Sequence, residues 1–486
     1  MTGFNKANKS YNGEDEFEAK QRVRLQLDAV ASESLSGTVF FEIGAQTWGQ
    51  NSTGGALGAD NADVVKLKNA YIDWMVPQTD LKVRMGIQGI ALPSMTTGSN
   101  VFNDDVAGVV ASYQFNENVG LTAFWARPWN DNFTGWNDNG HGDNYQSNYM
   151  DNVDVFALLL PLSFDGVKVT PWGMYAAIGP NAFAKQRVDG DGNPTGRSYF
   201  NVSGTSVKYP AAGMFPAGGA MHKDGGLVNK HLGSYGNAWW AGLTGEVTMW
   251  DPFRIAWDFN YGSAQYDESR LNRSGWLASL LFEYKLDWGI PGLYGWYASG
   301  DDDNPANGSE RMPSMSVNNN NNNGFSNFAF NGNPYIAREG ILGYSMAGTW
   351  GIGARVKDVS FVEDLKHTLR VNYIGGTNAP KMAKYLSGND ARGYKGIDGA
   401  YPYISGPNMQ GLGMDPLYMT TEDSALEIGL TNEYKMYENF TVMLDAAYLA
   451  TWIDHSKSTW GRSTMNGKSD QERDPWNVNL SFVYAF

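Results

Sequence analysis

The chain has 486 residues, a formal net charge of -15, a pI of about 4.8 and a mean hydropathy of -0.41. So acidic a chain is not built to bind nucleic acid through a basic surface. No apolar stretch approaches the roughly 18 residues that a membrane-spanning helix needs. These values exclude a helical membrane protein and give no reason to expect nucleic acid as a partner.

The texture of the chain is uniform. Short alternating runs and Gly/Asn/Asp-rich gaps continue from residue 1 to residue 486, and no Pro- or Ser-rich linker divides them. We therefore expect one domain over residues 1–486, because a single β architecture can grow by adding strands. The chain contains no cysteine, which suits an exported protein without disulfides.

The segment from Phe17 to Ala29 alternates along its whole length. Its odd positions are mostly apolar and its even positions are polar or charged. This alternation continues for longer than in an ordinary globular strand, and it predicts a strand that can cross a bilayer with tilt.

The same alternation returns in segments 81–88, 253–261, 368–373 and 440–448. In each segment one face is apolar and aromatic, and the other is polar, small or charged. Alternation alone does not separate a membrane barrel from a soluble sandwich, because both have one apolar face.

Two kinds of connection alternate along the chain. Short turns are expected at 77–80, 116–118, 165–166, 251–252 and 437–439, and long polar connections at 49–63, 129–152, 179–236, 300–340 and 377–422. Long loops at one end and tight turns at the other are typical of outer-membrane barrels. We predict an all-β fold, a closed antiparallel transmembrane β-barrel of about 16 or 18 strands with long external loops and short periplasmic turns.

Aromatic residues recur near the expected strand ends, at Trp74, Trp125, Trp129, Trp250, Trp276, Trp288, Trp452 and Trp476. In a membrane they would form interfacial girdles, and in a soluble protein they would be core or glycan-stacking residues. The last segment has an apolar face that runs from Trp476 to the terminal Phe486. A final strand that ends in Phe resembles the assembly signal of bacterial outer-membrane proteins.

Four stretches carry a family resemblance: EFEAKQRVRLQLDAVASESLSGTVFFEIG (Glu16 to Gly44), LKNAYIDW (Leu67 to Trp74), VRMGIQ (Val83 to Gln88) and VAGVVASYQF (Val106 to Phe115). They are similar to Gram-negative outer-membrane porins, and more narrowly to the homotrimeric porins of sulfate-reducing, Desulfovibrio-like bacteria. The resemblance implies a water-filled channel in the cell outer membrane, through which small hydrophilic solutes and ions diffuse. It also implies a homotrimer surrounded by outer-membrane lipid, with no enzymatic activity and no cofactor.

The number of strand candidates can be compared with the number that a closed barrel needs. About seventeen strand candidates are present, whereas a closed single-chain bacterial barrel has an even number. Residues 1–12 also lack the apolar core of a signal peptide. We therefore expect a leader and a first strand before residue 1, with residues 1–15 as the remainder of an external loop.

In general porins the loop after the fifth strand folds into the barrel. With the expected first strand counted, Val83–Gln88 is the fifth strand and Ala91–Asp105 is the inward loop. The resemblance then implies that the pore is lined by Arg22, Arg24, Lys82, Arg84, Asp104 and Asp105. The two aspartates would face the four basic residues and create a transverse field across the pore.

Two alternatives to this arrangement stay open. Arg22, Arg24 and Arg84 must face the lumen if the strands span the membrane, because a charge facing lipid costs roughly 2 to 4 kcal/mol. They could serve stability there by pairing with Glu18, Asp28 or Asp73. The constriction could instead be formed by residues 129–152.

Rival functions are a barrel that acts through its external loops as an adhesin or enzyme, and a soluble carbohydrate-binding β-protein. No Ser/His/Asp or paired-carboxylate set can be assembled, so no catalytic site is expected. The five histidines stand in isolation. Asp189, Asp191 and Asn193 resemble half of a calcium loop that lacks its last Glu, and Asp301–Asp303 is expected to be a solvated loop, so no metal site is expected.

Overall fold

In the computed structural model the described residues are 17–57, 65–130, 151–183, 186–188, 194–197, 213–217, 219–223, 228, 230, 232–315, 325–330, 342, 345–382, 418–452 and 474–486. The expected external-loop remnant at residues 1–15 lies outside them. So do the half calcium loop at 189–193 and most of the alternative constriction at 129–152.

The described residues form one large antiparallel sheet of 18 strands and one small sheet of two. The large sheet contains β1 (Lys20–Ser32), β2 (Leu35–Thr47), β3 (Val65–Met75), β4 (Leu81–Ala91), β5 (Asn103–Gln114), β6 (Gly120–Asn130), β7 (Asn152–Leu159), β8 (Leu162–Phe164), β9 (Val167–Ile178), β12 (Gly236–Val247), β13 (Phe253–Gln265), β14 (Arg273–Tyr284), β15 (Ile290–Ala298), β16 (Thr349–Val362), β17 (Leu365–Gly376), β18 (Ser424–Tyr437), β19 (Phe440–Trp452) and β20 (Trp476–Tyr484). The small sheet pairs β10 (Gln186–Val188) with β11 (Pro194–Arg197). The predicted all-β antiparallel fold is confirmed.

Strands that follow each other in the chain pair in the large sheet, from β1 to β20. β7 and β8 both pair with β9, so together they fill one position in the sheet. The 18 strands therefore occupy seventeen positions among the described residues. Because neighbouring positions are antiparallel, β1 and β20 run in the same direction, and among the described strands these two do not pair with each other.

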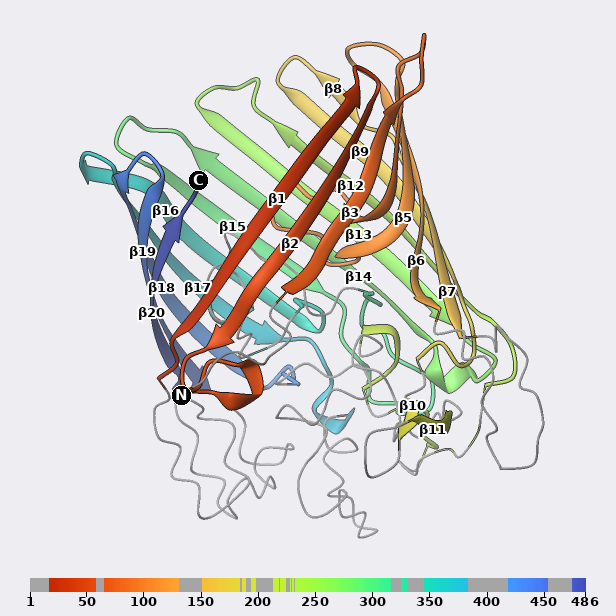
Figure 1. The fold of residues 1–486 in the computed structure, drawn as a ribbon. Coiled ribbons are helices and arrows are strands. Elements are labelled where there is room, and N and C mark those ends of the chain that lie inside the picture. Colours follow the sequence, from red (N-terminus) through yellow and green to blue (C-terminus); the bar gives the residue numbers. More distant parts are fainter. Residues whose placement is uncertain are drawn as a thin grey trace.

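Short turns gather at one end of the sheet, the upper end in Figure 1. The predicted turns follow β3, β5, β8, β12 and β18, and each joins two adjacent strands directly. At the other end the long connections begin, after β2, β4, β6, β9, β15, β17 and β19, together with a seven-residue connection after β13. The expected segregation of turns from loops is therefore confirmed, and we call the two ends the turn end and the loop end.

The two faces of the sheet differ in chemistry and exposure. On β13, Phe253 and Phe259 are 53% and 45% exposed, whereas the alternate residues Ala256 and Asp258 are 0% and 5% exposed. Large apolar side chains are exposed in the same alternating way on strands from β1 to β20. Since successive side chains of a strand point to opposite faces, the outer face is an apolar band and the inner face carries the polar residues.

Seven of the eight tryptophans expected near strand ends belong to the exposed outer surface: Trp74, Trp125, Trp250, Trp276, Trp288, Trp452 and Trp476. Trp129 differs, because it packs edge to face on Phe183 with ring centroids 5.2 Å apart, beside the buried core. A register shift between Ala126 and Trp129 precedes this position in β6. The alternation that would have directed Trp129 outward is interrupted there.

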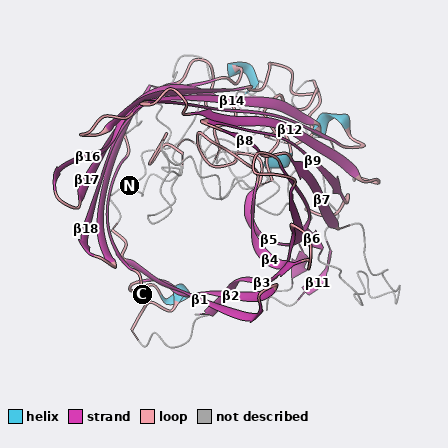
Figure 2. Ribbon diagram, turned by 90° about the horizontal axis from the view of Figure 1, so that it is seen from above, coloured by secondary structure: helices cyan, strands magenta, loops and turns pink. Residues whose placement is uncertain are grey.

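The hydrophobic core lies inside the ring of strands and is built partly from loop residues. Figure 2 shows non-strand segments gathered within the ring beside β5, β8 and β12. Among the buried loop side chains are Phe102, Phe183, Met214, Phe325 and Phe330. This core fills part of the lumen with packed side chains.

Within the described part of the chain, no helix has both the length and the apolar character needed to cross a membrane.

Candidate functional site

The candidate site is the inner wall of the sheet together with two segments that fold onto it. We call residues 92–102, which join β4 to β5, the first inward segment. Residues 311–315 and 325–330, from the connection between β15 and β16, are the second inward segment. Both leave the loop end and both are largely buried.

The first inward segment starts and ends on neighbouring strands. Leu92 N donates a hydrogen bond of 2.9 Å to Phe102 O, which closes the base of the segment. Phe102 then stacks on Phe124 of β6, with ring centroids 6.1 Å apart. The inward loop predicted after β4 is therefore present, but it covers residues 92–102 instead of 91–105.

The middle of this segment reaches β13 and β14. Ser94 Oγ donates to Asp258 Oδ2 at 2.6 Å, and Met95 N donates to Asp258 Oδ1 at 2.9 Å. Thr96 adds its own N–H and hydroxyl to Asp258, and its Oγ1 lies 2.7 Å from Ser279 Oγ. The segment thus spans from β4 to strands that are far away in the sheet.

Asp258 belongs to a polar row across the inner wall. In the pairing register Thr170, Thr244, Asp258 and Ser279 lie directly opposite one another on β9, β12, β13 and β14. Residues directly opposite on one face of a sheet are close enough to interact. This row is the surface on which the first inward segment docks.

The second inward segment is held by Glu427 of β18, which is almost fully buried. Glu427 Oε1 accepts hydrogen bonds from Asn327 N and Phe328 N, both 2.9 Å long, and from Ser326 Oγ at 3.2 Å. Its other oxygen accepts from Asn372 of β17 at 2.9 Å. A buried carboxylate on the wall therefore holds each inward segment.

Arg273 of β14 joins several segments inside the ring. Its guanidinium donates to the carbonyl oxygens of Phe215, Arg311 and Met312 at 2.9 to 3.1 Å. The two inward segments also touch, because Met315 N donates to Val101 O at 3.0 Å. The segments therefore form one hydrogen-bonded body.

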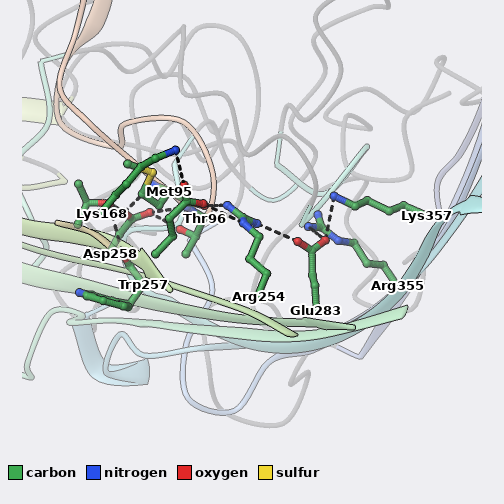
Figure 3. A network of polar contacts seen from close by, with 11 residues as sticks. Met95, Thr96, Lys168, Arg254, Trp257, Asp258, Glu283, Arg355 and Lys357 are labelled. Carbon is green, nitrogen blue, oxygen red and sulfur yellow. Dashed lines mark hydrogen bonds and ion pairs between the residues drawn. The ribbon is translucent and has the colours of Figure 1, made fainter. Parts of the chain in front are cut away.

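A row of charged residues runs beside the first inward segment (Figure 3). Glu283 of β14 contacts Arg254, Arg355 and Lys357 at 2.8 to 2.9 Å. Arg254 and Lys168 share a second acid, Glu246, at 2.9 and 3.1 Å. Because each acid is shared by two or more bases, the row is rich in positive charge.

The four basic residues expected to line the pore lie on the inner face of β1 and β4. Arg22 and Arg24 both contact Glu42 of β2, at 3.5 and 3.0 Å. Both arginines therefore form an ion pair with an acidic residue, as the stability alternative expected, but the partner is Glu42 and not Glu18 or Asp28.

Lys82 and Arg84 of β4 share Asp73, at 3.3 and 2.7 Å, as the stability alternative anticipated. The guanidinium of Arg84 also lies 4.1 Å from the ring centroid of Tyr71. These pairs are partly exposed, so solvent can reach the charges.

Asp104 and Asp105 do not lie in the inward loop. They belong to β5, where they pair with Ile90 and Gly89 of β4. Asp105 forms an ion pair with Lys68 and accepts from Asn69 Nδ2 at 2.9 Å. The β4–β5 hairpin is therefore longer than predicted, and Asp105 lies with Lys68 and Asn69, while the expected opposition of Asp104 to the four basic residues stays a prediction.

Sequence reasoning did not single out Asp258, Glu283 or Glu427. The alternation placed Arg254 and Asp258 on the polar face of their strand, and this was the available signal. Their partners could not be read from the chain, since Asp258 and Thr96 are separated by 162 positions.

The acidic segment Asp301–Asp303 is bonded within the protein. Asp301 Oδ2 accepts from Tyr418 OH at 2.6 Å, and Asp303 contacts Lys381 at 3.0 Å. Burial, reinforced by Asp301 and Asp302, raises the pKa of the nearby Glu310. Among the described residues no group of three or more His, Cys, Asp or Glu side chains is arranged to hold a metal ion.

Comparison with known proteins gives structural likeness only. No family model matches the chain, and no curated protein matches it. Pseudomonas aeruginosa OpdK, solved with vanillate, has a TM-score of 0.47 and 8% identity over 96% of this chain and 92% of that one. Pseudomonas aeruginosa OpdL has a TM-score of 0.46 and 10% identity over the same shares, 96% and 92%.

A third similar structure is a loop-deletion mutant of OmpT, an outer membrane protein of Vibrio cholerae. Its TM-score is 0.33 and its identity 9%, over 90% of this chain and 87% of that chain.

Proposed function

We propose that the protein is an outer-membrane porin, a channel through which small hydrophilic solutes and ions diffuse passively. The observation that carries this proposal is the two-faced sheet. Its outer face is an exposed apolar band, and its inner face carries ion pairs and polar rows. A soluble protein rarely exposes so extensive an apolar surface, whereas a membrane barrel requires one.

The exposed side chains on the inner face of β1 support a passage beside this strand. Arg22, Arg24, Gln26 and Asp28 are all exposed, whereas the inner residues of β13 and β14 are largely buried under the inward segments. We infer that solutes pass along β1 to β4, with Arg22, Arg24, Lys82 and Arg84 in contact with them. The pore-lining role of these residues stays a prediction, as does that of Asp104 and Asp105.

The ion-pair clusters of the wall favour anions. The ion pairs of the inner wall join Glu42 to Arg22 and Arg24, Asp73 to Lys82 and Arg84, Glu246 to Lys168 and Arg254, and Glu283 to Arg254, Arg355 and Lys357. Four acids thus contact eight bases. Rings of basic residues select for anions, so we propose weak anion preference in the lumen.

Liposome swelling tests the proposal directly. Purified protein is reconstituted into lipid vesicles, which are then diluted into isotonic solutions of sugars of graded size. We expect rapid swelling with small sugars and progressively slower swelling with larger ones. Vesicles that contain the folded protein but do not swell would contradict the porin proposal and favour an adhesin or an enzyme.

We also propose that the protein is a homotrimer. Support comes from the resemblance of stretches such as Glu16–Gly44 to the homotrimeric porins of sulfate-reducing bacteria. Light scattering of the detergent-solubilised protein, corrected for bound detergent, should give three times the mass of its single chain. A mass of one chain would contradict it.

A further strand between β1 and β20 is proposed to close the sheet. β1 and β20 run parallel, so a strand of opposite direction would pair with both as every neighbouring pair in the sheet does. We propose that the expected segment before residue 1 supplies it. The intact mass of the protein extracted from its native membrane should then exceed 53.4 kDa, and an equal mass would contradict this source.

A further inference from the structure

Asp258 of β13 accepts an unusual number of hydrogen bonds. Four of its five donors belong to the first inward segment: Ser94 Oγ, Met95 N, Thr96 N and Thr96 Oγ1. The fifth is Thr244 Oγ1 on the neighbouring strand. The wall alone therefore supplies one of the five.

The carboxylate and the segment depend on each other. Asp258 is only 5% exposed, and a buried carboxylate is costly unless hydrogen bonds stabilise its charge. If the segment moved away, Asp258 would lose most of its donors and the backbone N–H groups of Met95 and Thr96 would lose their acceptor. The docked arrangement is thus stabilised from both sides.

Two further contacts fix the same segment to the wall. Arg254 Nη2 donates to Met95 O at 3.0 Å, and Thr96 Oγ1 lies 2.7 Å from Ser279 Oγ. Arg254 also binds Glu246 and Glu283, so the segment is connected to the charged row (Figure 3). The position of the segment and the charges beside it form one network.

We propose that Asp258 is the positioning residue that holds residues 92–102 back against β13 and β14 and so keeps the passage beside them open. This inference rests on the proposed channel function and deepens it. The ends of the segment are fixed independently by the hydrogen bond between Leu92 and Phe102. Loss of Asp258 therefore removes four of the hydrogen bonds that hold the middle of the segment, which then leaves the wall more often while its base stays in place.

Single-channel recording of Asp258→Ala tests the proposal. We expect brief closures, and the fraction of time that the channel is closed should exceed the wild-type fraction by about tenfold or more. This is the factor expected for losing one hydrogen bond to a charged acceptor. Asp258→Asn, which keeps the shape and loses the charge, is the second variant in case the alanine protein does not fold. It should show the same closures, because its amide Nδ2 replaces a carboxylate oxygen and cannot accept the hydrogen bonds of the segment.

A disulfide provides the decisive rescue. The chain has no cysteine, so Thr96→Cys with Ser279→Cys creates a single defined pair whose parent oxygens lie 2.7 Å apart. In the Asp258→Ala background, oxidation should restore the wild-type record and reduction should bring the closures back. A role limited to folding would not respond to the redox state in this way.

The matched control is Asp267→Asn. Asp267 also accepts a hydrogen bond from a loop N–H, that of Gly233 at 2.8 Å, but it lies outside the inner wall. Its substitution should therefore leave the single-channel current record unchanged. If the wild type forms channels and the Asp258 variants give the same current record, the role of Asp258 is overturned while the channel function stands. A silent wild type would overturn the channel function, and the rate of disulfide formation would still report whether Asp258 positions the segment.

Discussion

Arg22 and Arg24 gain little stability from their ion pairs. Both contact Glu42, and their side chains are 33% and 36% exposed. Ion pairs with this degree of exposure contribute about 0 to 1 kcal/mol, because water and salt screen them. Their positive charge should matter chiefly to ions that pass β1.

The double substitution Arg22→Gln with Arg24→Gln removes that charge without removing a buried group. We expect the reversal potential under a salt gradient to shift toward cations, while the folded barrel is retained. Lys285→Gln, in an exposed turn between β14 and β15, is the control and should leave the reversal potential unchanged. An equal shift in both proteins would show that Arg22 and Arg24 have no special place in the passage.

Glu268, in the connection between β13 and β14, gives a pH prediction. Hydrogen bonds from Arg270 hold the pKa of Glu268 below its ordinary value of 4.5. A lowered pKa means that the charged form stabilises the folded connection. This stabilisation is present above 4.5 and is lost as the pH falls through the lowered pKa.

We therefore expect hydrogen-exchange protection of Leu271 and Asn272, whose N–H groups are bonded within this turn, to fall in the acid range. Glu268→Gln should have weak protection at neutral pH and little further change on acidification. Equal pH dependence in the variant would contradict the role of this carboxylate.

At the scale of elements, glycine and tryptophan are matched across neighbouring strands of the inner wall. Trp296 of β15 lies directly opposite Gly351 of β16, and a Cβ atom at Gly351 would meet the indole ring at 2.3 Å. The ring donates to Thr349 Oγ1 at 3.1 Å and packs on Phe325 and Phe330 of the second inward segment. Gly351 thus lets the indole lie where the segment can pack on it.

Gly351→Ala should displace that indole and destabilise the protein by roughly 1 to 3 kcal/mol, as overpacking does in a filled core. The temperature at which the folded band disappears in heat-modifiability gels measures the effect. Gly173→Ala is the control, since a Cβ there meets only an ordinary contact of 3.8 Å. The same loss of stability in both variants would contradict the packing account.

The strands were predictable from the sequence because alternation is local. Phe17–Ala29 and 253–261 anticipated β1 and β13, and the position of the fifth strand anticipated an inward loop. The end of that loop was placed wrongly, because Asp104 and Asp105 extend the β4–β5 ladder despite their low strand propensity.

The groups that hold the inward segments could not be predicted in the same way. Asp258 and Glu427 lie on polar faces that alternation identifies, but their donors come from segments far away in the chain. Nothing local distinguishes an aspartate that binds a loop from one that faces water.

At the scale of the whole molecule, charge is distributed unevenly. The chain carries a net charge of -15, yet the ion-pair clusters of the inner wall hold more bases than acids. Net charge alone would have suggested a cation channel. We propose instead that these clusters give the passage a weak preference for anions, since charges act most strongly at close range.

Single-channel conductance in a planar lipid bilayer tests the central claim most directly. The detergent-purified protein should produce stepwise increases in current, in groups of three if the trimer is correct, with a reversal potential that shows weak anion preference. A folded protein that inserts into the bilayer and passes no current would contradict the account of the inner wall as a water-filled passage.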